Sequence, residues 1–185
     1  MPRIVAGRAR GRRLSVPGRG TRPTSDRTRE ALFDSLAGLL DLDGAVVLDL
    51  FAGTGAVGLE ALSRGAGRVV FVESDRRAAT VLTANVDTVG LSGATIRLLD
   101  ARSYLAGVPE DGEGVFDFVF ADPPYALSEE ALATLLARLV DRLSAAAIVV
   151  VERSRRSPAP SWPDVIEPIK SKQYGESMLW YGRPR

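Results

Sequence analysis

Apolar residues along the chain recur first at helical spacing and then in short continuous runs. Leucines from position 32 follow the spacing i, i+4, i+7 and i+8, which predicts a helix that begins near Ser25 and ends between Gly38 and Leu42. These leucines are Leu32, Leu36, Leu39 and Leu40. The apolar run 45–50 then meets a cluster of glycines, as a buried parallel strand does where it enters a turn.

The same alternation of helix and strand continues to about residue 152. Further helices are predicted over 56–64, 75–89, 101–106 and 128–143, and further strands over 68–73, 94–99, 116–121 and 146–152. Because strands that alternate with helices form parallel sheets, the predicted fold class is α/β, a Rossmann-like, doubly wound and mostly parallel sheet. Two later runs, 165–170 and 177–181, flank a turn at Tyr174-Gly175 and predict a C-terminal antiparallel hairpin at one sheet edge.

The first 23 residues differ from the rest in composition. They are rich in Arg, Gly and Pro, and they contain two short apolar pieces, 4–6 and 14–16, that can pair as a small β-hairpin. We interpret residues 1–23 as a basic N-terminal extension that lies outside the core. Residues 24–185 then form the domain that carries the sheet.

Positive charge is concentrated in the same part of the chain. The first thirty residues carry nine arginines against Asp26 and Glu30, a net charge of +7, and the whole chain has a formal net charge of +1, so the remainder is −6. Guanidinium groups suit phosphate contacts and stacking on bases. We therefore expect a nucleic acid to contact Arg3, Arg8, Arg10, Arg12, Arg13, Arg19 and Arg22. The alternative is a solvated basic tail with no specific role.

The residue types that are missing narrow the chemistry. No cysteine or histidine occurs in the 185 residues, so the thiolate and imidazole ligands of most zinc and iron sites are absent, as is imidazole acid-base catalysis. We expect no metal. The N-terminus lacks the apolar run of a signal peptide, and the longest apolar stretch, 145–151, is too short to span a bilayer. A cytoplasmic protein without membrane contact is expected.

A glycine loop follows the first predicted strand. The glycines at 53, 55 and 58 satisfy the pattern G-x-G-x-x-G between a strand and a helix, where glycine allows a sharp turn and a close approach to a ligand. Twenty positions past Gly53, Glu73 ends the second strand, where its carboxylate can accept hydrogen bonds from both hydroxyls of a ribose. NAD and S-adenosylmethionine both carry that ribose.

Two further acids distinguish these cofactors. Asp49 lies at the strand end just before the turn, where a carboxylate favours a cationic ligand over a pyrophosphate. S-adenosylmethionine has an ammonium and a sulfonium group. Asp100, at the third strand end, is placed to accept a hydrogen bond from the adenine amine. The structural alternative is that Asp100, like Asp75, caps a helix.

The most specific motif is Asp122-Pro123-Pro124-Tyr125, directly after the fourth predicted strand. Two prolines in a row remove two backbone donors and fix φ, which leaves the Asp122 carboxylate and the Pro123 carbonyl as acceptors on a rigid turn. Two acceptors that converge on one point suit an NH₂ group and orient its lone pair for in-line displacement. Tyr125 can then stack on a base. The alternative is an ordinary proline-stiffened loop.

These motifs resemble the RsmD family of bacterial methyltransferases, which methylate the exocyclic N2 of one guanine in small-subunit (16S) ribosomal RNA. The resemblance runs over nearly the whole chain and includes two further stretches, Arg22-Pro23-Thr24-Ser25-Asp26-Arg27-Thr28-Arg29-Glu30-Ala31-Leu32-Phe33 and Lys172-Gln173-Tyr174-Gly175. It implies a class I methyltransferase fold with S-adenosyl-L-methionine as cofactor. Its partner would be ribosomal RNA, free or within an assembling small subunit, which the N-terminal arginines would bind.

The resemblance also assigns site residues. Asp122, Pro123, Pro124 and Tyr125 would hold the guanine as the catalytic turn. The cofactor would be bound by Thr24, Asp49, Phe51, Ala52, Gly53, Thr54, Gly55, Glu73, Ser74, Asp100, Ala101 and Asp122.

Three other functions stay open at this point. A DNA adenine-N6 methyltransferase shares the same catalytic turn, but such enzymes generally need an added region that reads base edges, for which a chain of this length has little surplus. A non-catalytic RNA-binding protein would have no use for Asp122 and Tyr125. A dinucleotide-dependent oxidoreductase is disfavoured by Asp49, because its carboxylate would oppose a pyrophosphate.

Overall fold

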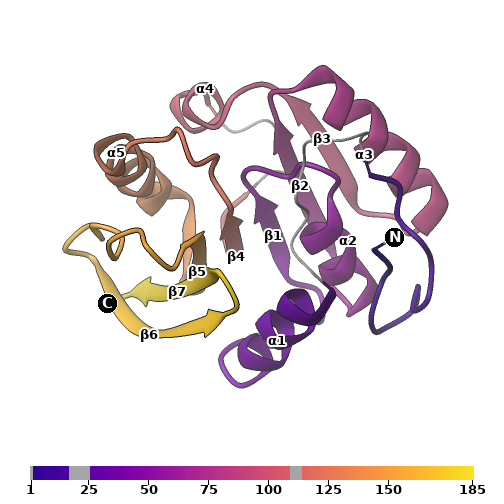
Figure 1. The fold of residues 1–185 in the computed structure, drawn as a ribbon, viewed down its shortest axis with the longest axis horizontal. Helices are drawn as coiled ribbons and strands as arrows, with labels where there is room; N and C mark the ends of the chain where they lie inside the picture. The colour runs from indigo at the N-terminus through magenta and orange to yellow at the C-terminus, as the bar shows by residue number, and fades with distance from the viewer. Residues whose placement is uncertain (1, 17–25, 109–113) are drawn as a thin grey trace.

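The computed structural model describes residues 2–16, 26–108 and 114–185, which form one sheet with helices on both faces (Figure 1). The seven strands are ordered β3-β2-β1-β4-β5-β7-β6. Five are parallel: β1 (Val46–Asp49), β2 (Arg68–Glu73), β3 (Ala94–Leu98), β4 (Phe116–Ala121) and β5 (Leu143–Ser154). The hairpin of β6 (Ile166–Tyr174) and β7 (Ser177–Pro184) adds to the β5 edge, with β7 antiparallel to both neighbours. The α/β fold with a C-terminal antiparallel hairpin is confirmed.

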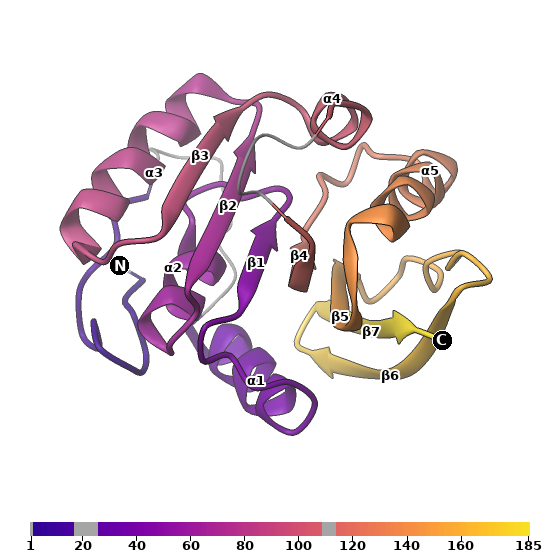
Figure 2. The same cartoon turned by 180° about the vertical axis from the view of Figure 1, so that it is seen from behind.

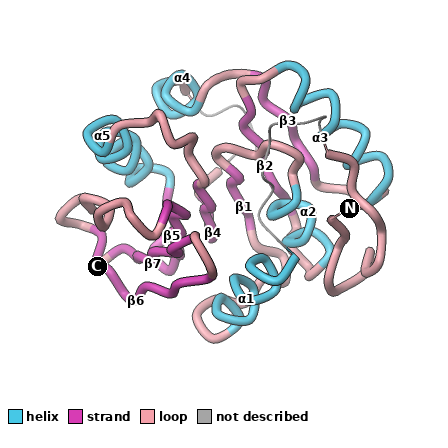
Figure 3. The backbone as a smooth tube through the Cα atoms, viewed as in Figure 1, coloured by secondary structure: helices cyan, strands magenta, loops and turns pink. Residues whose placement is uncertain are grey.

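The helices bury the two faces of this sheet separately (Figures 2 and 3). One hydrophobic cluster contains residues of α1 (Asp26–Ala37), α2 (Ala56–Ser63) and α3 (Arg76–Val89), and the other contains residues of α4 (Ala101–Ala106) and α5 (Glu129–Leu139). Alternate strand residues belong to alternate clusters, so that Val47 packs with the first and Leu48 with the second. Within the described ranges, no helix combines the length and the apolar content that a bilayer-spanning helix needs.

The element boundaries depart from the apolar pattern around residue 143 and in the hairpin, where β6 continues to Tyr174 and β7 to Pro184 instead of ending at 170 and 181. The strands over 68–73 and 116–121 and the helix over 101–106 are found at their predicted bounds. The helix predicted over 128–143 instead ends at Leu139, a 3-10 turn covers Val140–Arg142, and β5 is longer than predicted. Pairing causes the difference, because Leu143 lies opposite Phe116 of β4 and Ser154 lies opposite Ser177 of β7.

The N-terminal segment 2–16 packs into the core, so its interpretation as an extension outside the core is wrong for the described part. Ile4, Ala9 and Leu14 are buried in the same cluster as α1 and α2. The predicted hairpin is reduced to one antiparallel bridge between Arg3 and Arg13. Three apolar side chains of this basic segment are therefore part of the core of the sheet domain. The division predicted between residues 23 and 24 lies outside the described residues.

The tight approach of this segment to α2 requires a glycine. Gly7 has a φ of +79°, and a Cβ atom there would lie 1.8 Å from the carbonyl oxygen of Ser63. The same serine bonds the segment on both sides: its hydroxyl donates to the Ala6 carbonyl at 2.5 Å and accepts from the Ala9 amide at 2.9 Å. The segment is therefore positioned on the C-terminal end of α2 by backbone contacts as well as by burial.

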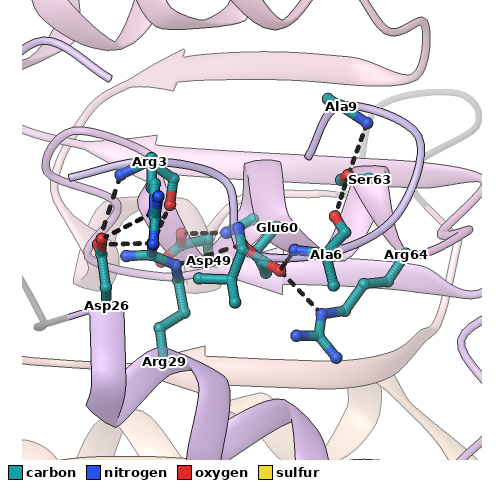
Figure 4. Close-up of polar contacts among 11 residues, drawn as sticks. Arg3, Ala6, Ala9, Asp26, Arg29, Asp49, Glu60, Ser63 and Arg64 are labelled. Atoms are coloured by element: carbon teal, nitrogen blue, oxygen red, sulfur yellow. Dashed lines mark hydrogen bonds and ion pairs between the residues drawn. The ribbon is translucent and has the colours of Figure 1, made fainter. Parts of the chain in front are cut away.

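Figure 4 shows the polar network that joins the segment to α1 and α2. Glu60 of α2 is fully buried and accepts hydrogen bonds from the backbone amides of Val5 at 2.8 Å and Ala6 at 2.9 Å. The equally buried Arg29 of α1 lies 3.4 Å from Glu60 and 2.9 Å from Asp26, and it also donates to the carbonyl oxygen of Arg3. The charges of Arg29 and Glu60 thus compensate each other inside the protein.

Candidate active site

A large cavity lies at the carboxyl ends of the parallel strands. Its volume is about 1130 Å³, and residues at the ends of β1, β2, β4 and β5 line it. At the centre of the sheet β1 and β4 are neighbours, and the chain continues from β1 to a helix on one face and from β4 to a helix on the other. Ligands of open α/β sheets bind at such a switch point.

Most residues predicted to bind the cofactor meet at this cavity. Asp49, Phe51, Ala52, Gly53, Thr54, Glu73, Ser74, Asp100, Ala101 and Asp122 line it, and so do Pro123, Pro124 and Tyr125 of the predicted catalytic turn. Gly55 is not among the lining residues. Thr24 lies outside the described residues. The arrangement of strand ends therefore brings together the acids that the sequence places far apart.

The glycine loop is held to the second strand by Glu73. The two carboxylate oxygens of Glu73 accept hydrogen bonds from the amides of Gly53 and Asp75, both at 2.7 Å. Gly53 has a φ of +54°, and a Cβ atom there would meet nothing within 4 Å, so the backbone borders open space. The loop leaves room for a ligand at this position.

Gly55 has a packing function in the same loop. It caps the start of α2 with a φ of +77°, and a Cβ atom there would lie 2.2 Å from a methyl group of Leu82 in α3. Asn85 of α3, also buried, donates to the Thr54 carbonyl at 2.9 Å and bonds both backbone groups of Ser15. The loop is therefore fixed from behind by α3 and linked through Asn85 to the N-terminal segment.

Asp49 is buried at the end of β1 with 2 % of its surface exposed. Its carboxylate accepts a hydrogen bond from the Gly58 amide at 3.0 Å. Burial raises the pKa of Asp49 to about 7, the Gly58 hydrogen bond opposes this rise, and the nearby charge of Glu73 adds to it. A cation bound beside Asp49 would favour its ionised form.

Asp122 begins the predicted catalytic turn directly after β4. Burial raises its pKa to about 8, and the charges of Glu152 and Asp49 contribute to this rise, whereas Arg153 opposes it. Pro123 is buried, whereas the side chain of Tyr125 is 81 % exposed at the cavity. The turn thus presents one carboxylate inside the cavity and one aromatic ring at its surface.

Asp100 has the capping role that was the structural alternative. It caps α4, accepting hydrogen bonds from the Ser103 amide at 3.0 Å and from its hydroxyl at 2.7 Å, and these bonds lower the pKa of Asp100. Asp75 caps α3 in the same way through the Ala78 amide. Because Asp100 also lines the cavity, capping leaves it at the ligand edge in its ionised form.

The predicted nucleic-acid-binding arginines fall into two groups. Arg8 donates to the Leu62 carbonyl, and Arg12 donates to the carbonyls of Thr88 and Val89, so both hold the segment to the domain. Arg3 is 68 % exposed beside Asp26, and Arg10 and Arg13 are exposed. Arg19 and Arg22 lie outside the described residues. At least two of these arginines therefore support the fold.

Several cavity residues escaped the sequence analysis. Arg27 and Thr28 contribute from α1, Glu152 and Arg153 from β5, and residues 173–177 from the turn between β6 and β7. Glu152 and Arg153 were open to prediction, because they end a parallel strand as Glu73 does. Arg27, Thr28 and residues 173–175 were noted only as parts of family motifs, Glu176 and Ser177 were in neither motif, and the place of all of them at the cavity depends on long-range packing.

The chain is similar to ribosomal RNA methyltransferases in sequence. A family model described as "Conserved hypothetical protein 95" matches residues 2–183. Ribosomal RNA small subunit methyltransferase D of Escherichia coli (strain K12) is 44% identical over 126 residues, an alignment that covers 66% of this chain but only 60% of that relative. "Putative rRNA methyltransferase YlbH" of Bacillus subtilis (strain 168) is 34% identical over 178 residues, 94% of each chain.

A solved structure supports the same relationship. The "Putative methyltransferase yhhF from Escherichia coli" superposes with a TM-score of 0.83 at 35% sequence identity, covering 99% of this chain and 97% of that chain. The similarity therefore includes the N-terminal segment and the C-terminal hairpin as well as the central sheet.

Proposed function

The chain belongs to the RsmD family, whose model matches residues 2–183, and from that premise we propose that it transfers a methyl group from S-adenosyl-L-methionine to the exocyclic N2 amine of a guanine in small-subunit ribosomal RNA. Relatives named ribosomal RNA small subunit methyltransferase D support ribosomal RNA as the substrate. We place the activity in the cytoplasm, on ribosomal RNA that is free or within an assembling small subunit.

The cavity residues fit S-adenosyl-L-methionine. The cavity, at about 1130 Å³, exceeds the roughly 300 to 1,000 Å³ of ordinary small-molecule pockets, which leaves room for a cofactor and a base. Gly53 borders open space through which the cofactor would pass. Glu73 would accept hydrogen bonds from the ribose hydroxyls, and Asp100 would accept one from the adenine amine. The buried Asp49 would compensate the positive charges of the cofactor. When bound, the cofactor supplies an electrophilic methyl group on a sulfonium.

The observation that carries the proposal is the position of Asp122 inside this cavity, on a turn stiffened by two prolines. The carboxylate of Asp122 and the carbonyl of Pro123 would accept the two N–H groups of an amine. Such bonds draw the nitrogen out of conjugation with the ring and aim its lone pair at the reacting carbon. Tyr125 would stack on the base, which explains an exposed aromatic ring at the cavity.

The reaction then needs little from the protein besides position and charge. The turn would hold the amine nitrogen so that it could bond to the methyl carbon that the cofactor would supply, with the electron pair of the broken carbon–sulfur bond left on sulfur. The positive charge that develops on nitrogen is stabilised by the ionised Asp122 carboxylate. The nitrogen loses one proton after methyl transfer, and Asp122, whose pKa is raised by burial, can accept it.

The direct test is methyl transfer to ribosomal RNA in vitro. The protein is incubated with isotopically labelled S-adenosylmethionine and either naked small-subunit RNA or isolated small subunits from cells that lack the gene, and the digested nucleosides are identified by mass spectrometry. We expect label in N2-methylguanosine and in no other nucleoside. Label in N6-methyladenosine, or none with either substrate, would contradict the proposal. Comparing the two substrates decides between free and assembled RNA.

A further inference from the structure

Glu152 occupies a position that the proposed reaction does not use. Ala121 of β4 and Val151 of β5 are register partners, so the next residues, Asp122 and Glu152, lie side by side at the carboxyl ends of adjacent parallel strands. Glu152 is 6 % exposed and lines the cavity with the catalytic turn. Its charge is one cause of the raised pKa of Asp122, which is consistent with this proximity. Two acidic side chains therefore border the place where the base would enter.

Two acids at one edge of a base favour a base that offers hydrogen-bond donors at two neighbouring positions of that edge. An ionised carboxylate only accepts hydrogen bonds. Guanine presents an N1–H donor directly beside its N2 amine, so its Watson–Crick edge offers donors to two neighbouring carboxylates. Adenine presents an N1 lone pair beside its N6 amine, which a second carboxylate would repel. Enzymes that act on a flipped-out base read this edge by hydrogen bonds.

We propose that Glu152 is a specificity-determining residue that accepts the N1–H hydrogen bond of the target guanine while Asp122 holds the neighbouring N2 amine. This inference rests on the proposed function, because it names how that site chooses its base. It assigns separate tasks to the two acids: Asp122 acts on the reacting nitrogen, and Glu152 recognises the adjacent ring nitrogen. The Asp-Pro-Pro-Tyr turn is then compatible with guanine or adenine, and the acid of β5 decides between them.

Strand pairing fixes the position of the Glu152 backbone. Glu152 lies within β5, which pairs with β4 on one side and places Glu152 opposite Leu179 of β7 on the other. Val151, the residue before Glu152, pairs with β4, and Glu152 itself pairs with Leu179 of β7, so the backbone of Glu152 is held beside the start of the turn that carries Asp122. Buried polar groups that lose their partner reject an incorrect substrate strongly, because the site is left with an unpaired group.

A base analogue separates recognition from chemistry. 2-Aminopurine has the same exocyclic N2 amine as guanine, but its N1 is a lone pair instead of an N–H donor. The substrate is the RNA segment in which nucleoside analysis locates the methylated guanine, made with guanine or with 2-aminopurine at that position. We expect the wild-type protein to methylate the guanine RNA about 10- to 100-fold faster in kcat/KM, the cost of one charged hydrogen bond.

Glu152→Gln is the diagnostic variant, because a glutamine amide can accept from guanine N1–H or donate to the N1 of 2-aminopurine. The ratio between the two substrates should fall to within about threefold of unity. The affinity for the 2-aminopurine RNA relative to the guanine RNA, measured with the demethylated cofactor bound, should rise in the variant, a readout that needs no turnover. Glu130→Gln, an exposed acid on α5 outside the cavity lining, is the matched control and should keep the wild-type ratio.

Each outcome supports or overturns the inference. If the wild type methylates both RNAs equally, or if Glu152→Gln keeps the full preference for guanine, the inference is wrong although the proposed function stands. If no guanine is methylated at all, the proposed function fails first and the inference fails with it. Should Glu152→Gln not fold, the ratio between the two RNAs measured with the wild-type protein still overturns the idea when it is close to one.

Discussion

Two buried acids lie at the short helix α2, one within it and one hydrogen-bonded to it, and their surroundings differ in how they compensate the negative charge. Glu60, which belongs to α2 and is fully buried, receives hydrogen bonds from two backbone amides and ion pairs from Arg29 at 3.4 Å and Arg64 at 2.9 Å. Asp49, almost as deeply buried at the end of β1, accepts from the amide of Gly58 in α2, and burial raises its pKa to about 7. Figure 4 shows both acids in one view.

The contrast separates a structural acid from the acids of the proposed active site. The charge of Glu60 is compensated by arginines of the chain itself, and the result is a fixed joint between the N-terminal segment, α1 and α2. Asp49 and Asp122 border a cavity, and their ionised forms are disfavoured by burial and by other acids. Strongly perturbed acids in a cavity are typical of ligand and catalytic sites. The same change from acid to amide should therefore have opposite effects on stability at the two sites.

The largest effect on folding is expected at the compensated site. Glu60→Gln removes the negative charge and leaves the guanidinium of Arg29, which is fully buried, without its buried counter-charge. Breaking a buried pair in this way costs about 3 to 5 kcal/mol. Urea denaturation should show this loss in the free energy of unfolding. Glu30→Gln, on the exposed face of the same α1, should change it by less than about 0.5 kcal/mol. A loss below about 1 kcal/mol for Glu60→Gln would mean that the network contributes little.

The next effect is on turnover, at the functional site. Asp122→Asn keeps an acceptor oxygen but removes the charge that stabilises the developing positive nitrogen, so the rate of methyl transfer should fall about 10² to 10³-fold. RNA affinity should stay nearly unchanged, because it comes mainly from phosphate contacts. Single-turnover kinetics at saturating cofactor and RNA separate the two quantities. A rate close to wild type would show that the turn has only a structural function.

Asp49→Asn should raise the free energy of unfolding, whereas Glu60→Gln should lower it. The unfolded chain ionises Asp49 near pH 3.8 and the folded protein near pH 7, so the folded protein binds the extra proton in between. Stability of the cofactor-free protein therefore falls as the pH rises through this window. Asparagine does not titrate, and the variant should be more stable than the wild type by about 2 to 4 kcal/mol at pH 8, with no such gain near pH 4. Thermal denaturation across this range measures it, and a destabilised variant at pH 8 would reverse the interpretation.

The smallest effect, on RNA affinity, is expected for two exposed arginines whose charge is not paired with a carboxylate of the described chain. The side chains of Arg10 and Arg13 make no hydrogen bond or ion pair with another described residue, in contrast to Arg29. Replacing both by alanine should leave cofactor binding intact and reduce RNA affinity. The slope of log affinity against log salt should flatten by somewhat less than one unit for each phosphate that is no longer neutralised. Arg138→Ala on α5 is the control, and an unchanged slope in the double variant would remove Arg10 and Arg13 from the RNA-binding surface.

The sequence was informative where the position of a functional group follows from the order of strands and helices along the chain. Strand ends of a parallel sheet meet at one edge, so Asp49, Glu73 and Asp122 could be placed together from the apolar runs alone. The joint around Glu60 could not be predicted, because nothing local distinguishes a buried glutamate on a helix from an exposed one. The N-terminal segment was misjudged for a related reason: its arginines dominate the composition, whereas three buried apolar side chains and hydrogen bonds to α2 fix its position. Glu152 belongs to no motif, although it ends the predicted strand 146–152, and the register of β4 and β5 shows that it lies beside Asp122.

Proton release on cofactor binding tests the central claim, which is that a bound cationic ligand compensates the negative charges of Asp49 and Asp122, as arginines of the chain compensate that of Glu60. Calorimetric titration with S-adenosylmethionine at pH 7, in two buffers of different ionisation enthalpy, measures the protons released. Because a bound cation favours the ionised acids, whose pKa values lie near 7 and 8 without it, we predict release of about 0.5 to 1 proton per cofactor, and less in Asp49→Asn. A binding heat that is the same in both buffers would contradict the account.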